Sequence, residues 1–170
     1  MRLFAITIFV LVGALMAKPV TAQDAKPPLD AAAAAKIKSE VSDVVASYLK
    51  AFNARDLKGF AEIHAIPSFV VLPSGNIVAN LYTEDIAKRF GDAIKQLMAE
   101  GWDRTKLDIA SVCVLTANTA LASGRTTRYR TDGSVMGVLA ATLVSVRTDA
   151  GWRIAGVMLQ QPNKIVTCNE

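Results

Sequence analysis

The chain has 170 residues, of which 52% are hydrophobic, so it is long enough to form one domain with a sizeable core. The formal net charge is +4, but two of the 19 basic residues, Arg2 and Lys18, lie in an amino-terminal segment that we expect to be removed. The remaining 17 basic and 15 acidic residues are spread along the chain, which argues against nucleic acid as a partner.

Residues 1–22 are predicted to be a signal peptide. Arg2 gives a short positive start, an almost uninterrupted apolar run follows, and Val20-Thr21-Ala22 offers the small residues that a signal peptidase reads. The apolar run is shorter than the roughly 20 residues that span a bilayer. We therefore expect cleavage near Ala22, a periplasmic or secreted protein, and no stable membrane insertion afterwards. An uncleaved amino-terminal anchor is the alternative.

The first helix is expected to begin within residues 23–36, a stretch that combines a proline-containing linker with a run of alanines. Consecutive prolines block a helix, and Asp30 is a suitable cap for the helix-forming alanines that follow. Beyond this stretch, apolar residues recur at spacings of three or four and predict one buried stripe. The stripe consists of Ile37, Val41, Val44, Tyr48 and Phe52.

A second, short helix is expected after Asp56, which would cap it. Its predicted inward positions are Leu57, Phe60, Ala61 and His64, the single histidine of the chain. Two short strands, 67–72 and 77–81, should follow around a Pro-Ser-Gly-Asn turn.

A third helix is predicted to begin at a Thr83 cap and to end at Gly101. Its buried face would hold Ile86, Phe90, Ile94 and Leu97. Four long strands are predicted to follow and to form an antiparallel meander, because only short polar connections separate them. The strands are 107–116, 120–130, 135–147 and 152–161. This order of elements predicts an α+β domain at 37–161 with a carboxy-terminal tail at 162–170.

The two cysteines, Cys113 and Cys168, leave two possibilities open. In an oxidising compartment they can pair, and closing so long a loop would contribute about 4 kcal/mol on the chain-entropy model. Alternatively, Cys113 is buried in a strand and Cys168 is free in the tail.

The stretch SYLKAFNARDLKGFAEIHAIPSFVVLPSG and the closing strand GWRIAGVMLQ resemble the nuclear transport factor 2-like superfamily of cystatin-like α+β folds. The resemblance covers roughly residues 41–161. It implies a curved, mainly antiparallel sheet of about six strands wrapped around three helices as a cone with a central pocket. It also implies a homodimer, since many such proteins pair through the sheet. The superfamily holds both enzymes and non-enzymatic modules, so function must be argued from the site.

Ketosteroid isomerase is the best comparison within that superfamily. The resemblance places Tyr48 at its oxyanion-stabilising tyrosine and Leu72 at its general base. Its second oxyanion-site acid falls near Thr142 or Leu143. Enolisation needs a base near the carbon acid and donors at the developing oxyanion. Of the three groups that supply them, the tyrosine is present, whereas the general base and the second oxyanion-site acid are missing. The sequence argues against that chemistry.

His64 is the strongest remaining candidate for chemistry in the pocket. An ordinary imidazole changes charge near pH 6.5, which suits general acid–base work beside Tyr48. The alternative is a hydrogen-bonded histidine that seals a bend between a helix and a strand. One histidine and two distant cysteines make no recognisable zinc site, so neither a metal nor another cofactor is expected.

Strand SGRTTRYR carries three arginines, and alternation places Arg125 on one face and Arg128 with Arg130 on the other. One set would reach the mouth of the cone and bind a carboxylate; the alternative is solvated arginines or dimer contacts. We expect Arg125 to be the ligand-binding one. The predicted ligand-binding residues are Tyr48, His64, Phe52, Phe60, Phe69, Phe90, Arg125, Met158 and Gln160.

The sequence leaves three hypotheses about function open. The leading hypothesis is an exported, dimeric domain that binds an apolar or weakly polar small molecule. The second is a lyase, isomerase or hydrolase with His64 as base and Tyr48 as donor. The third is a protein-interaction module of the cell envelope, with the sheet as its contact surface.

Overall fold

The first helix, α1 (Ala31–Ala54), forms where the alanine run and the apolar stripe predict it. The Asp30 carboxylate caps it by accepting the backbone N–H of Ala33 at 2.7 Å. Arg55, with φ of 59°, ends the helix in a left-handed conformation. The computed structural model describes residues 29–168, so the predicted signal peptide lies outside the described residues.

The two other helices also begin at acidic side chains. Asp56 caps α2 (Leu57–Glu62) by accepting the Gly59 N–H at 2.9 Å. For α3 (Thr83–Ala99) the cap position is Tyr82, one residue before the predicted Thr83. The Asp85 carboxylate there accepts the backbone N–H groups of Leu81 and Tyr82, so the side chain that closes this helix end lies inside the helix.

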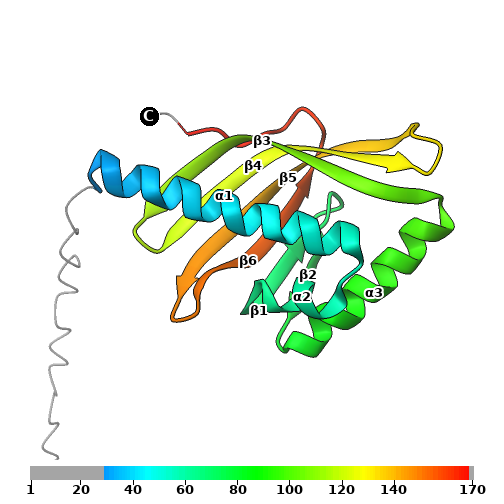
Figure 1. The fold of residues 1–170 in the computed structure, drawn as a ribbon, viewed down its shortest axis with the longest axis horizontal. Coiled ribbons are helices and arrows are strands. Elements are labelled where there is room, and N and C mark those ends of the chain that lie inside the picture. The colour runs from blue at the N-terminus through cyan, green and yellow to red at the C-terminus, as the bar shows by residue number, and fades with distance from the viewer. Residues whose placement is uncertain (1–28, 169–170) are drawn as a thin grey trace, which may run out of the picture.

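Six strands form one curved, mixed sheet against which the helices pack (Figure 1). The strand order is β2-β1-β6-β5-β4-β3, and all neighbours are antiparallel except β1 and β6, which are parallel. The predicted fold class is therefore confirmed. The strands are β1 (His64–Val71), β2 (Ile77–Asn80), β3 (Trp102–Thr116), β4 (Thr119–Arg130), β5 (Val135–Thr148) and β6 (Gly151–Gln160).

Two element boundaries differ from the prediction by more than one residue. Helix α2 ends at Glu62, so His64 is the first residue of β1 and not the last inward position of a helix. Strand β3 begins at Trp102, directly after Gly101, which ends α3 with φ of 86°. In both places the chain passes from helix to strand without a loop, which periodicity alone does not detect.

The helices bury their apolar faces in two adjoining clusters on the concave face of the sheet. Along α1, Ile37, Val41 and Val45 pack against the alanines and leucines of the central strands. Farther along the chain, an aromatic cluster joins the end of α1 to α2, α3 and the start of β3; its rings are Phe52, Phe60, Phe90 and Trp102. At the same place the Asn53 side chain bonds the backbone N–H and carbonyl of Thr105, at 2.8 and 2.9 Å.

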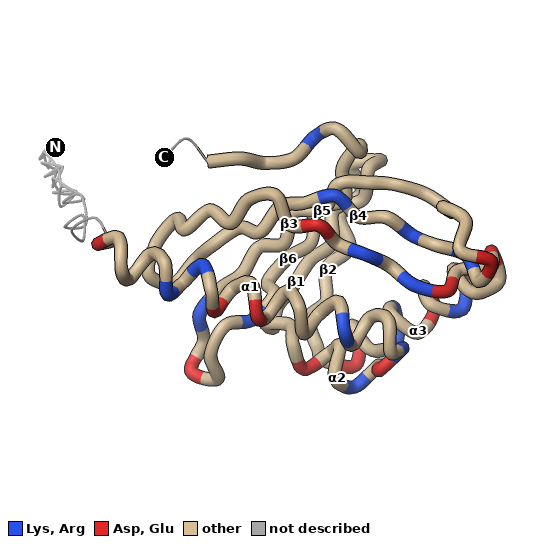
Figure 2. The backbone as a smooth tube through the Cα atoms, turned by 45° about the horizontal axis from the view of Figure 1, so that its top comes forward, with Lys and Arg blue, Asp and Glu red and all other residues tan. Residues whose placement is uncertain are grey.

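The carboxy-terminal tail, residues 161–168, covers part of the convex face, opposite the helices (Figure 2). The Val166 N–H donates to the hydroxyl of Ser123, which in turn bonds Thr142. Cys168 forms a disulfide with Cys113, with their Cα atoms 5.7 Å apart. The structure therefore selects the bridged alternative of the two that the sequence left open. No helix within residues 29–168 has the length and apolar character needed to cross a bilayer.

We predict that replacing both cysteines, Cys113→Ala with Cys168→Ala, lowers the free energy of unfolding by about 2 to 4 kcal/mol, because the open chain gains entropy when unfolded. Urea unfolding with and without a reductant measures this. The reductant should lower the stability of the wild type and leave that of the double variant unchanged. Equal stability of wild type and variant under oxidising conditions would contradict the prediction.

Candidate ligand-binding site

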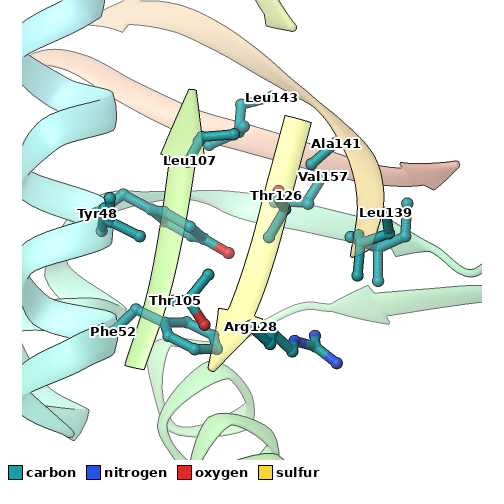
Figure 3. Close-up of a pocket in the computed structure, with 12 residues that line it drawn as sticks. Tyr48, Phe52, Thr105, Leu107, Thr126, Arg128, Leu139, Ala141, Leu143 and Val157 are labelled. Atoms are coloured by element: carbon teal, nitrogen blue, oxygen red, sulfur yellow. The ribbon is translucent and has the colours of Figure 1, made fainter. Parts of the chain in front are cut away.

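A cavity of about 360 Å³ lies between the three helices and the concave face of the sheet. A narrower recess of about 50 Å³ shares five of its lining residues and reaches farther under α1 (Figure 3). The shared residues are Tyr48, Phe52, Arg128, Val157 and Leu159. The larger volume falls within the range of small-molecule sites in proteins.

Most of the cavity wall is apolar and aromatic. Phe60 and Phe90 stack with ring centroids 3.8 Å apart, and Phe52 packs against both. The rest of the apolar wall comes from aliphatic side chains of β1, the residue after it, β2, β6 and α3: Val70, Leu72, Val78, Ile86, Ala93, Leu97, Val157 and Leu159. An apolar molecule would replace water on these surfaces, which is the main source of binding free energy in such sites.

Tyr48 extends from α1 into the space that both cavities share (Figure 3). Burial raises the pKa of its hydroxyl to about 12, and the nearby positive charge of Arg128 opposes that shift. The hydroxyl therefore keeps its proton at neutral pH. Among the described residues it has no hydrogen-bond partner, so it is available as a donor to a bound molecule.

His64 faces the same cavity from the start of β1, with its ring 5.8 Å from that of Tyr48. Its Nδ1 lies 2.7 Å from the Phe60 carbonyl oxygen, and because a carbonyl only accepts, Nδ1 carries the proton. Burial lowers the pKa of the imidazole, and the hydrogen bond to Phe60 opposes this in part. At neutral pH the ring is therefore neutral, with Nε2 as a free proton acceptor.

The cavity is also lined by three polar side chains that the sequence analysis did not predict to bind a ligand. Arg128 reaches it from β4, and Arg89 lies at its wall with one guanidinium nitrogen bonded to the Ala79 carbonyl at 2.7 Å. Asn80 is 4% exposed; its amide nitrogen donates to Ser68, and its Oδ1 has no partner among the described residues. Burying an unsatisfied acceptor costs free energy, which a donor on a ligand would recover.

The cavity brings together five of the nine predicted ligand-binding residues: Tyr48, His64, Phe52, Phe60 and Phe90. The other four do not line it, which corrects their predicted positions. On β6, Val157 faces inward, so its neighbour Met158 faces outward, as does Gln160, which bonds Thr142. On β1, Val70 faces inward, and the ring of Phe69 packs against the outer side of Gly156, where a Cβ would meet it at 2.3 Å.

Arg125 is the fourth corrected position. It is exposed on the convex face of β4, while Arg128, three residues later, faces the cavity. Both faces of this strand segment are polar, so the pattern predicts an alternation without saying which set points inward. The inward alanines Ala120 and Ala122 earlier in the same strand are the signal that fixes the register, because they share their parity with Arg128.

The positions that correspond to the ketosteroid isomerase carboxyls carry no acid. Leu72 lies in the cavity wall, so the place of the general base is apolar. Leu143 lines the narrow recess, and Thr142 lies on the convex side, bonded to Gln160. Within residues 29–168 no group of three or more metal-binding side chains comes together.

This architecture, a curved sheet around helices with an interior cavity, defines an α+β cone of the cystatin-like type. The sequence model of a family described as NTF2-like protein (DUF6841) matches residues 39–162. The chain belongs to this NTF2-like family, as the resemblance predicted. The sequence matches no curated protein.

Solved structures agree on the fold. An NTF2-like protein with a cystatin-like fold from Novosphingobium aromaticivorans is 22% identical, with a TM-score of 0.64 over 78% of this chain and 88% of that one. A putative dehydratase of the NTF2-like family from Streptomyces avermitilis is 15% identical, with a TM-score of 0.59 over 77% and 99%. A ketosteroid isomerase-like protein from Erwinia carotovora atroseptica is 16% identical, with a TM-score of 0.55 over 71% and 92%.

We predict that His64 makes the protein less stable at acidic pH. Its pKa is lower in the folded than in the unfolded chain, so the unfolded chain binds the extra proton as the pH falls below about 6.5. In His64→Asn, whose amide retains a donor for the Phe60 carbonyl, this loss should be absent. Urea unfolding of both proteins from pH 7.5 to 5 gives the test. Carboxylates titrate in both proteins, so their effect cancels in the comparison. A difference in unfolding free energy between wild type and His64→Asn that stays constant from pH 7.5 to 5 would refute the prediction.

Proposed function

We propose that the protein is an exported domain that binds an apolar or weakly polar small molecule in the cavity of its cone. The observation that carries this proposal is the cavity of about 360 Å³, whose wall is mainly aromatic and aliphatic and whose few polar groups converge on one space. A fold that needed only stability would gain by filling such a volume, because unfilled apolar space costs packing energy.

The disulfide supports the exported part of this proposal. Disulfides persist in the periplasm and outside the cell and are rare in the cytosol. Cys113 and Cys168 are the only two cysteines of the chain, and they are joined. Together with the predicted signal peptide, this favours a periplasmic or secreted location. We also propose a homodimer that pairs through the convex face, part of which the tail covers.

A tryptophan in place of Val78 should test the binding site directly. Val78 lines the cavity from β2, so Val78→Trp would fill part of it. The neutral fluorescent probe phenylnaphthylamine is expected to bind the wild type. It should bind Val78→Trp at least about tenfold more weakly, because the indole occupies space that a ring of the probe would fill, and failing to bury one such ring costs about 1.5 kcal/mol or more.

The adjacent residue gives the matched control. Ile77 is 71% exposed and its side chain points to the other face of β2, so Ile77→Trp should leave probe affinity unchanged. Thermal unfolding of both variants verifies that they are folded. If phenylnaphthylamine and a library of apolar acids, sterols and polyketides all fail to bind the wild type, the proposed function is wrong.

An enzyme is the second candidate, favoured by the pairing of a free acceptor with a free donor. His64 is neutral with an unprotonated Nε2, and the Tyr48 hydroxyl is protonated and unpartnered among the described residues. A base and a donor on one cavity suit isomerisation, elimination or hydrolysis of an apolar substrate. The third hypothesis, an interaction module with a filled cone, gains no support from the open cavity.

For the enzyme candidate we expect turnover that follows one ionisation below pH 6.5 and stays level above it, since the base must be neutral and its pKa is lowered. His64→Gln should reduce the rate by about 100-fold or more. A screen of isomerase, lyase and hydrolase substrates with pH–rate profiles provides the measurement. Turnover that His64→Gln leaves unchanged would exclude His64 as the base.

A further inference from the structure

Arg128 is the one strongly charged group that points from the sheet into the interior of the cone without a partner among the described residues. It lines both the cavity and the recess, and its Nε atom is buried with no hydrogen bond. Burial lowers its pKa from the ordinary arginine value, which reflects the cost of removing this charge from water. Because Arg128 is half-buried, removing part of its guanidinium from water costs free energy that an anion beside it would recover.

The surroundings of Arg128 supply no such anion. The lining residues of the cavity and the recess include Arg89 but no aspartate or glutamate. Glu100 is the acid whose charge acts on Arg128, and it does not line either space. No ion pair within 4.0 Å joins Arg128 to an acid in residues 29–168. The wall of the cavity therefore carries a positive charge that no acid within residues 29–168 pairs with directly.

The Tyr48 hydroxyl lies near this charge. Both residues line the cavity and the recess, Tyr48 from α1 and Arg128 from β4, and the guanidinium of Arg128 is turned away from Tyr48 in the view of Figure 3. They are close enough for the arginine charge to act on the tyrosine hydroxyl. A carboxylate oxygen accepts hydrogen bonds from both a guanidinium and a hydroxyl, and charge-assisted bonds of this kind are the stronger ones.

We propose that the natural ligand carries a carboxylate, which Arg128 and Tyr48 bind, while its apolar body lies against Phe52, Phe60 and Phe90. This inference rests on the proposed binding function and specifies the chemical class of the ligand. The free Nε2 of His64 and the free Oδ1 of Asn80 are both acceptors, so they favour a hydroxyl or another donor elsewhere on the same molecule.

Naphthaleneacetate and its primary amide, naphthaleneacetamide, form a matched pair that tests the charge alone. Both have the same ring system and nearly the same shape, and only the first is an anion. Isothermal titration of the oxidised, full-length mature protein should give at least about tenfold tighter binding of the carboxylate than of the amide, since a hydrogen bond to a charged group is worth about 1.5 to 3 kcal/mol.

Variants at the two arginines of β4 assign this preference to a residue. Arg128→Met should reduce the carboxylate-to-amide preference to about one, and Arg128→Lys, which keeps the charge, should retain part of it. Tyr48→Phe should weaken carboxylate binding several-fold and leave amide binding nearly unchanged. Arg125→Met removes an arginine from the opposite face of the same strand and should change neither affinity. Arg128→Met is expected to fold, because Arg128 is half-buried and makes no ion pair with an acid in residues 29–168 that the substitution would break.

The outcomes separate the two proposals. If both compounds bind the wild type equally, or if the preference survives in Arg128→Met, the carboxylate inference is overturned and the binding function stands. If Arg125→Met removes the preference, the anion binds the convex face and the inference is again overturned. If neither compound nor phenylnaphthylamine binds, both proposals fail together.

Discussion

The aromatic contacts where the three helices meet the start of β3 hold the rest of the arrangement in place. Phe60 of α2 stacks on Phe90 of α3, and Phe52 of α1 contacts both rings and packs at a right angle to Trp102 at the start of β3. The end of α1, helices α2 and α3, and the start of β3 therefore meet in one cluster. Because planar rings contact one another at faces and edges, they fix the angles between the helices while leaving the adjoining space open. The cavity is a product of this packing geometry.

The sequence predicts those parts of the fold that depend on local chemistry. Acidic caps, an alanine-rich helix and short polar turns each act over a few residues, so α1, α2 and the meander of β3 to β6 follow from them. The inward position of His64 was expected on a helix, whereas the ring reaches the cavity from a strand, held by its hydrogen bond to Phe60. The side chain is in the expected place, but a direct passage from helix to strand puts it there.

The candidate site was only partly predictable, because it depends on which face of each strand is concave. Phe69 and Met158 are apolar, yet they belong to the convex face, where Gly156 leaves room for the Phe69 ring. Arg125 and Arg128 differ only in parity, and a strand with two polar faces does not reveal which parity points inward. Pairing with the rest of the sheet and contact with α1 decide this, and both arise only in the folded protein.

The tail has a consequence for how the convex face meets other molecules. The tail, residues 161–168, is joined to β3 through the disulfide of Cys168 and covers Ser123 and Thr142, which are 1% and 0% exposed. A second copy of the chain, or any other protein, that approached this part of the convex face would contact the tail before it reached the strands beneath it. The specificity of such a contact would therefore depend on residues 161–168, and reduction of the Cys113–Cys168 disulfide would change the surface that the partner contacts.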